Sequence, residues 1–558
     1  MKILNLLRNL PAWPAAALIA FTLSSCKPQQ ADLILINGII HTIKDGEGEN
    51  WDVAQALAIS KDKITAVGTT QEILAEFRSD KIIDLQGMKV YPGFVDAHCH
   101  FHSLAKQSLQ VDLTGTASFD EVISRVDSFA LNFDTDWIVG RGWDQNDWDI
   151  REFPDNSYFN EKYPNRPVFL KRIDGHAAIA NAEALRRAGI YPGRTIPGGI
   201  IGLNKSRLTG FLVDNAVDSV DSYIPEFARS ILIPAMLQAQ NACFAVGLTT
   251  LDDAGLDKDI IDLIDSLQHE SLLKIRIYAM ANPTSANIGH FLAKGPRKTE
   301  RLNVRSFKLY ADGALGSRGA LLLSPYTDAI FTSGLLRNSP EYFQDLMVRL
   351  DSKGFQVNTH CIGDSANRLF LHLYGEILHG KNDKRWRIEH AQVVHPGDLT
   401  RFSQYSVIPS VQPVHATSDM PWAELRLGKT RMKSAYAYFS LYEQTRKIAF
   451  GSDFPVENIN PLLGFYAAVE RKDTEGNPSD GFLPNQKVDR ETAMKAMTTW
   501  AAFANFEENE KGTIEKGKLA DLVIMDKDIM YIDPSEIPGT KVMYTIVAGE
   551  IVYSGVKP

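Results

Sequence analysis

The chain has 558 residues, of which 44% are hydrophobic and 23% are charged. This is the composition of an ordinary soluble enzyme with a large core. The formal net charge of -9 argues against a nucleic-acid partner, because binding phosphates requires a basic face. We find no repeat with a period of about 20–50 residues, which argues against a solenoid or a propeller.

Residues 1–25 have the order of features found in a secretory signal peptide. Lys2 and Arg8 form a positive region, and an apolar stretch from Leu10 to Leu23 follows them. That stretch is short for a transmembrane helix. Leu23-Ser24-Ser25-Cys26 resembles a bacterial lipobox. We therefore predict cleavage before Cys26, which is then lipidated.

The lipid anchor is the only membrane contact that the sequence predicts. Residues 26–31 form a short tether. Lys27 stands where an inner-membrane retention signal has Asp. This favours an exported, periplasm-facing protein on the outer membrane of a bacterial cell envelope. The alternative is an apolar N-terminus with an incidental cysteine. The other three cysteines have no disulfide spacing and are interpreted as thiols that are buried or near a site: Cys99, Cys243 and Cys361.

Two β-rich blocks lie at opposite ends of the remaining chain. Residues 32–89 contain short apolar runs separated by turn residues. Residues 505–558 contain the runs Ala520–Met525 and Val542–Val547. We predict that the two blocks pack together as one small composite β-sandwich.

Residues 90–504 alternate short apolar runs with helical stretches. There are eight such runs: Val90–Val95, Leu248–Leu251, Ile275–Met280, Ser306–Tyr310, Phe355–Asn358, Trp386–Ile388, Val407–Val411 and Ile448–Phe450. Eight strand–helix units predict an α/β fold, the (β/α)8 TIM barrel. The segment at about 104–233 interrupts the pattern after the first run, and we interpret it as an insertion.

Polar residues stand at the ends of several runs, where such barrels carry their chemistry. His98 and His100 end the first run, and their spacing places them on the same side of an extended segment. Two imidazoles on one side can bind a metal ion. Lys308 lies inside an apolar run, where an unpaired ammonium is costly. Three further residues end later runs: His360, His390 and Asp453.

Several motifs resemble the amidohydrolase superfamily. Pro92-Gly93-Phe94-Val95-Asp96-Ala97-His98-Cys99-His100 resembles its signature, and Gly512–Val523 resembles its closing segment. The most similar branch is that of the YtcJ-like proteins, amidohydrolase family 3. The motifs shared with this branch are Lys308–Arg318, Thr359–Asp364, Ile388–Gln392, Gly451–Val456 and Asp174–Ala177. The resemblance runs from about Asp32 to Tyr553.

The resemblance implies a site for one or two divalent metal ions, with zinc favoured over iron, manganese or nickel. It implies that His98 and His100 bind the more buried ion, and that His360 and His390 bind a second. Lys308 would be N-carboxylated and bridge both ions. If Lys308 instead stays an ammonium, one metal remains, with His390 outside its coordination sphere and these ligands: His98, His100, His360 and Asp453.

The activity that the resemblance implies is hydrolysis of a small-molecule substrate at a non-peptide C–N bond, in an N-acyl, N-formyl or cyclic amide. A metal-activated hydroxide would attack the carbonyl carbon, and Asp453 would carry the proton to the leaving nitrogen. Two alternatives stay open. The same site could act on esters or in isomerisation, or the chain could be a metal-binding lipoprotein without catalysis. The sequence does not identify the substrate, and it leaves a homo-oligomer open.

Four further residues receive roles from their motifs. His176 in the insertion is a candidate substrate contact, with a structural histidine as the equal alternative. Arg318 is a candidate ligand for a substrate carboxylate, although an ion pair that holds its loop is favoured. Asp96 and Glu389 are expected to orient metal ligands or neighbouring strands.

Overall fold

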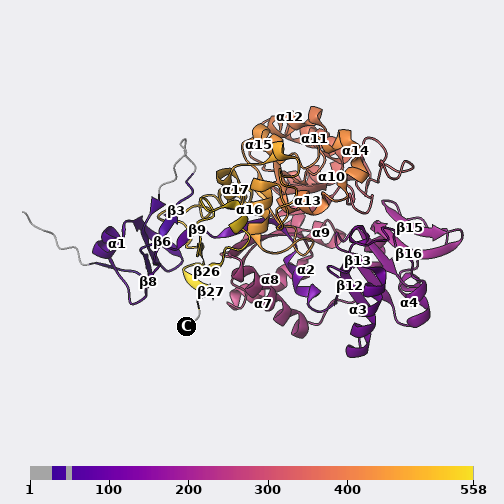
Figure 1. Cartoon of the computed structure of the whole chain (residues 1–558), viewed down its shortest axis with the longest axis horizontal. Helices are drawn as coiled ribbons and strands as arrows, with labels where there is room; N and C mark the ends of the chain where they lie inside the picture. The colour runs from indigo at the N-terminus through magenta and orange to yellow at the C-terminus, as the bar shows by residue number, and fades with distance from the viewer. Residues whose placement is uncertain (1–27, 45–52, 557–558) are drawn as a thin grey trace, which may run out of the picture.

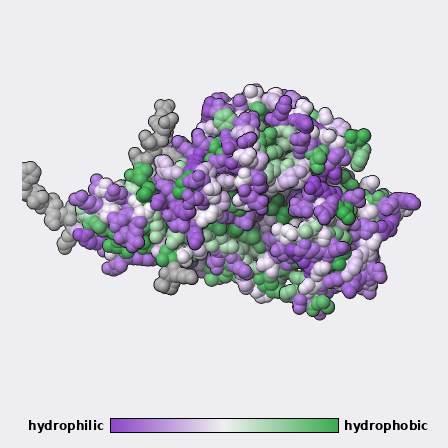
Figure 2. Space-filling model, viewed as in Figure 1, coloured by the Kyte–Doolittle hydropathy of each residue, from purple (hydrophilic) through white to green (hydrophobic). Residues whose placement is uncertain are grey.

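The computed structural model describes residues 28–44 and 53–556. The predicted signal peptide and Cys26 lie outside these residues, so the lipid anchor stays a prediction. No helix within the described ranges is long and apolar enough to cross a membrane. On the face seen in Figure 2, hydrophilic and hydrophobic residues are interspersed.

A parallel eight-stranded barrel forms the centre of the molecule. Its strands, each paired with the next, are β10 (Phe94–Cys99), β17 (Leu248–Leu256), β18 (Arg276–Ala281), β20 (Leu302–Tyr310), β21 (Gln356–Cys361), β22 (Arg387–His390), β23 (Ile408–Val411) and β24 (Ala449–Phe450). The ring closes beyond β24, where the backbone N–H of Asp453 donates to the carbonyl of His98 at 2.7 Å. The predicted barrel fold is therefore confirmed.

Helices cover the outside of the barrel (Figure 1). They are α2 (Phe101–Gln107), α7 (Arg229–Ala245), α8 (Lys258–His269), α9 (Ser285–Lys294), α10 (Pro340–Asp351), α11 (Asp364–Leu378), α12 (Leu399–Gln404), α13 (Pro413–Asp419), α14 (Ala423–Met432), α15 (Tyr438–Thr445), α16 (Pro461–Glu470), α17 (Arg490–Ala496) and α18 (Thr499–Ala504). In α8, Ile261, Ile264 and Leu267 are buried. Their spacing of three residues places them on one face, which packs on the barrel core.

The first predicted strand is divided between two sheets. The sequence predicts one barrel strand over Val90–Val95, but β9 (Lys89–Pro92) belongs to a six-stranded sheet outside the barrel, and β10 begins at Phe94. Gly93 separates the two strands. A Cβ at this position would lie 2.4 Å from side-chain atoms of Thr249, so only glycine fits where the chain changes sheets.

The small sheets are formed partly by the two chain ends, as predicted. One contains β2 (Leu33–Ile36), β5 (Ala56–Ser60), β6 (Lys63–Gly68) and β8 (Ile82–Asp84). The other contains β3 (Ile39–His41), β4 (Val53–Ala54), β9, β25 (Leu522–Met525), β26 (Val542–Val547) and β27 (Glu550–Ser554). Leu33 and Leu35 share a core with Leu522 and Ile524. Ile34 points to the opposite face, against α1 (Thr70–Glu76).

The predicted insertion folds as a mixed six-stranded sheet with its own helices. Its strands are β11 (Val111–Asp112), β12 (Ile138–Trp143), β13 (Val168–Arg172), β14 (Ala177–Ala180), β15 (Gly199–Asn204) and β16 (Arg207–Asp214). Its helices are α3 (Phe119–Asn132), α4 (Ser157–Lys162), α5 (Ala182–Arg187) and α6 (Asn215–Asp221). This sheet lies on the side of the barrel away from the chain-end sheets (Figure 1). It buries separate apolar clusters, one around Trp137 and one around Trp143.

Candidate metal centre

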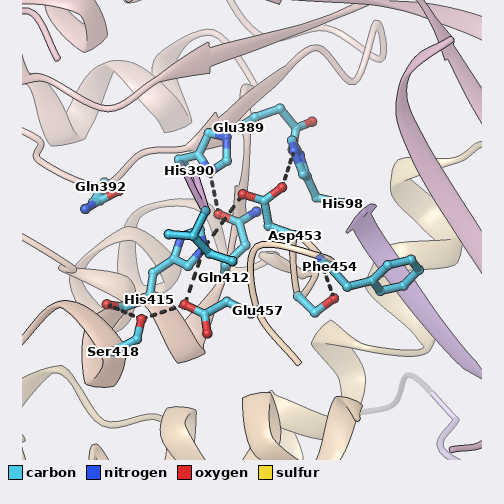
Figure 3. A network of polar contacts seen from close by, with 12 residues as sticks. His98, Glu389, His390, Gln392, Gln412, His415, Ser418, Asp453, Phe454 and Glu457 are labelled. Atoms are coloured by element: carbon cyan, nitrogen blue, oxygen red, sulfur yellow. Dashed lines mark hydrogen bonds and ion pairs between the residues drawn. The ribbon is translucent and has the colours of Figure 1, made fainter. Parts of the chain in front are cut away.

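Three candidate ligands form a tight group at the carboxyl ends of the barrel strands. One ligand atom of each of His98, His390 and Asp453 lies within 4.8 Å of the others, and all three residues are buried (Figure 3). His390 and Asp453 have left-handed backbone conformations, with φ of 71° and 64°. Such backbone costs about 1–3 kcal/mol in a non-glycine residue, and residues that hold it cluster at functional sites as well as in turns.

Two neighbours orient the histidines of this group. Nδ1 of His98 lies 2.5 Å from Oε2 of Glu389, and both side chains are fully buried. Nδ1 of His390 lies 2.8 Å from Oε1 of Gln412. With Nδ1 engaged as a donor, Nε2 of each ring carries the lone pair that a metal ion needs. Burial lowers the pKa of both imidazoles, which favours their neutral, ligating form.

Asp453 completes a set of donor atoms that fits a divalent cation. Its Oδ1 is buried and has no hydrogen bond of good geometry, although Nε2 of His100 lies 3.0 Å away and Nε2 of His98 lies 3.6 Å away. Burial alone would raise the pKa of Asp453, but the surrounding histidines hold it well below its usual range. Nitrogen and carboxylate donors that converge without bonding to one another are typical of a metal site.

Lys308 lies against this group. Its Nζ is 2.9 Å from Nε2 of His98, and the residue is buried. Burial lowers the pKa of Lys308 to about 8. No carboxylate among the described residues forms an ion pair with it. The lysine therefore directs its amino group at a ligand atom of a candidate metal ligand.

The other predicted ligands lie around the group. The side chain of His100 is 21% exposed and contacts Asp453. The His360 ring lies 4.5 Å from the ring of His390 and 4.8 Å from that of His176. Nδ1 of His176 in turn lies 2.6 Å from Oδ1 of Asp214. The predicted site residues are thus brought together, although the tightest group takes one histidine from each predicted pair.

Arg318 and Asp96 hold backbone around the site. Arg318 pairs with Asp328 through Nη2 to Oδ2, at 2.8 Å, and is not among the residues that line the cavity described below. Of the two roles considered for Arg318, this arrangement favours the ion pair that holds its loop. Asp96 accepts hydrogen bonds from Oγ of Ser452 at 2.6 Å and from the backbone N–H of His98 at 3.2 Å. It thereby joins the ends of β10 and β24. The cysteines at 99, 243 and 361 are buried thiols.

A cavity of about 350 Å³ gives access to the centre. The predicted site residues that line it are His100, His176, Lys308, His360, His390 and Asp453. Sequence reasoning missed His415, Asp419 and Glu457, which also line it. His415 and Glu457 lie four residues beyond the ends of predicted strand seven and of the Gly451–Asp453 segment. Extending the search from the strand ends into the following loops, where barrel enzymes place further site residues, would have found them.

Comparisons with known proteins give matches along most of the chain. A family model described as "Amidohydrolase family" matches residues 81–553. Protein LONG AFTER FAR-RED 3 of Arabidopsis thaliana is 32% identical, over 95% of this chain and 94% of its own. The putative amidohydrolase YtcJ of Bacillus subtilis is 30% identical, over 92% of this chain and 98% of its own.

Two further matches concern an enzyme and a solved structure. The N-substituted formamide deformylase of Arthrobacter pascens is 25% identical, over 94% of this chain and 99% of its own. The structure of an uncharacterized metal-dependent hydrolase from Pyrococcus furiosus is 28% identical. It superposes with a TM-score of 0.70 and covers 89% of this chain and 100% of that one.

Proposed function

The chain belongs to the amidohydrolase family, and from this premise we propose that it hydrolyses a C–N bond of a small, non-peptide amide. The observation that carries the proposal is the group of His98, His390 and Asp453, whose ligand atoms converge beside the cavity. The similarity to an N-substituted formamide deformylase along nearly the whole chain supports N-formyl or other N-acyl amides as substrates, with cyclic amides as the related class.

The residues present fit a divalent metal ion, and we propose zinc because imidazole-rich sites suit it. His98, His390 and Asp453 would hold the ion, with His100 and His360 as the additional ligands that the sequence predicts. When bound, such an ion lowers the pKa of water toward neutrality and polarises a carbonyl. The position of Lys308 also supports a carbamate at its Nζ, because an anionic carbamate can ligate where an ammonium cannot.

The chain's own residues then supply the proton transfers. The pKa of Asp453 is held below its usual value, so the side chain is ionised. Its Oδ1 has no hydrogen-bond partner of good geometry and is therefore open to accept the proton of the attacking water. The same carboxyl delivers the proton to the leaving nitrogen. Glu389 keeps His98 in one tautomer throughout, and Gln412 does the same for His390.

The test combines metal analysis with a hydrolysis panel on one sample of purified protein. We expect bound divalent metal and cleavage of at least one class among N-formyl amides, N-acyl amides and lactams. Esters are included because the same site could act on them. Metal-loaded protein that cleaves esters but no amide would refute the C–N assignment. Loaded protein that cleaves nothing would favour a non-catalytic metal-binding protein.

We also propose that the enzyme is exported and anchored by lipid on Cys26. The support is the order of positive residues, apolar stretch and lipobox-like segment in the sequence. An anchored, periplasm-facing enzyme would meet its small-molecule substrate outside the cytoplasm.

A further inference from the structure

Two partly buried carboxylates line the cavity without a cationic partner. They are Asp419, at the end of α13, and Glu457, in the loop after β24. No lysine or arginine within the described ranges forms an ion pair with either. The situation of Asp144 and Asp174, on the same cavity, is different, because both pair with Arg172. Asp147 also lines the cavity, but it is exposed to solvent. Asp419 and Glu457 are therefore the partly buried carboxylates of this cavity that neither an arginine nor the proposed metal ion accounts for.

Neutral donors fix both carboxylates in place. Oδ2 of Asp419 accepts hydrogen bonds from Oη of Tyr436 at 2.7 Å and from Nε2 of Gln392 at 2.9 Å. Oε1 of Glu457 accepts one from Oγ of Ser418 at 2.5 Å. Each carboxylate keeps a second oxygen for a ligand. Burial raises the pKa of Asp419 to about 7 and that of Glu457 to about 8, as expected for carboxyls that lack a nearby cation.

His415 gives an independent sign that a ligand binds here. The residue is 9% exposed and lines the cavity, and its Nε2 is buried without a hydrogen-bond partner. This atom lies 3.7 Å from Oδ2 of Asp453 and 3.9 Å from Oε1 of Glu457, which is too far for a hydrogen bond (Figure 3). A buried polar atom without a partner is costly, and a hydrogen-bonding group of a ligand in the cavity would satisfy it.

We propose that Asp419, His415 and Glu457 form a recognition site for a protonated amino group of the substrate. An ammonium carries three N–H donors and no acceptor. Carboxylate oxygens match that pattern, as does Nε2 of His415 in the tautomer that carries its proton on Nδ1. A bound cation would lower the pKa of both carboxyls, and the ionised carboxylates then supply the opposite charge. Trp422, hydrogen-bonded through its backbone N–H to the carbonyl of Asp419, lines the same wall and offers apolar surface to the alkyl chain.

This inference rests on the proposed function, because it names the class of amide that the metal centre cleaves. Nε2 of His415 lies within 3.9 Å of both Glu457 and Asp453. The cationic group therefore binds within a few bonds of the amide that is cleaved. The substrate class is an N-acyl or N-formyl amide of a short diamine, in which the second amino group stays free and protonated.

The experiment compares three formamides of matched chain length. N-formyl-1,4-diaminobutane is cationic, N-formylpentylamine is its neutral isostere, and 5-formamidopentanoate is anionic. With metal-loaded, full-length protein, we expect kcat/KM for the cation to exceed that for the neutral compound by about tenfold or more, with the anion poorest. Equal kcat/KM for the cationic and neutral compounds would overturn the proposal.

Two variants test the residues themselves. Glu457→Gln and Asp419→Asn should each lower kcat/KM for the cation about 10- to 100-fold. The neutral compound is the internal control. Its kcat/KM in each variant should stay within about twofold of the wild-type value, because it has no ammonium for the two carboxylates to bind. Glu443→Gln makes the same chemical change on α15, where Glu443 is 41% exposed and pairs with Arg446, and should alter neither rate. Variants that slow both compounds equally would contradict amine recognition.

A failure of hydrolysis is distinguishable from a failure of recognition. If none of the three formamides is cleaved, the proposed activity fails for this class. Calorimetry with the same cationic and neutral compounds then tests the amine site directly. Tighter binding of the cation, lost in Glu457→Gln, would support the site, and equal binding would refute it.

Discussion

Replacing Glu389 by glutamine tests whether the metal centre depends on the orientation of His98. Oε2 of Glu389 lies 2.5 Å from Nδ1 of His98, and both side chains are fully buried. The charged acceptor fixes the tautomer that leaves Nε2 free for a metal ion, and it makes the imidazole a stronger ligand. Glu389→Gln keeps the shape of the side chain and removes the charge.

The structure sets the size of the expected effect. A hydrogen bond to a charged group is worth about 1.5–3 kcal/mol, and this one is shielded from water on both sides. At about 1.4 kcal/mol per factor of ten, its loss should weaken metal binding roughly 10- to 100-fold. Titration of metal-free protein with zinc against a chromophoric chelator measures this affinity, and circular dichroism reports whether the fold is kept.

Glu507→Gln is the matched control. Glu507 is also buried, but it pairs with Lys511 and accepts a hydrogen bond from Asn303, near the start of β20 and so at the opposite end of the barrel. This variant should lose stability and keep its affinity for zinc. If Glu389→Gln is folded and binds zinc as tightly as the wild type, His98 does not depend on Glu389 and the reasoning fails.

Four further predictions follow from the site, the N-terminus and the sheet contacts. Asp453→Asn should keep fold and metal but lower kcat by about 10²- to 10⁴-fold; full turnover by metal-loaded variant would exclude its proton-transfer role. Lys308→Ala should lose one metal equivalent and be partly restored by short carboxylates, and unchanged metal content would rule out the carbamate. Cys26→Ser should shift the protein from the membrane to the soluble fraction, as followed by fractionation and mass spectrometry of the N-terminus. Asp521→Asn should lower the free energy of unfolding by about 3–5 kcal/mol, because Asp521 contacts Arg276 at 2.6 and 3.1 Å in a buried pair. Burial raises the pKa of Asp521, but Arg276 outweighs burial and holds that pKa below its usual value. Denaturation should therefore show the difference in unfolding free energy between wild type and variant at neutral pH. The difference should disappear as pH falls below about 4.

The barrel could be predicted because each of its strands overlaps a short apolar run that ends in polar residues. The candidate site could be predicted for the same reason, because His98 and Asp453 are polar residues at the ends of such runs. The break at Gly93 was not visible, because both halves of the run are apolar, and only pairing with different partners distinguishes β9 from β10. Alternation along a strand does not say which sheet the strand joins.

The surroundings of the site depend on contacts between distant residues. The bond between Glu389 and His98 joins two strands far apart in the sequence. Arg172, in the insertion, pairs with Asp144 and Asp174, and nothing in the local pattern of these charges indicates that they line the same cavity as His390. Sequence periodicity predicts which elements form, whereas the walls of a cavity are set by how the elements meet.

The pairing of β9 with β25 also constrains when the protein can finish folding. Pro92 lies opposite Leu522 in this ladder, and the ribosome makes the first long before the second. Until the last strands emerge, β9 can pair only with β3, and its other edge stays open to other chains. The six-stranded sheet can therefore be completed only when β25 to β27 have been made. A chain stopped short of Leu522 is expected to aggregate even though every residue of the barrel is present.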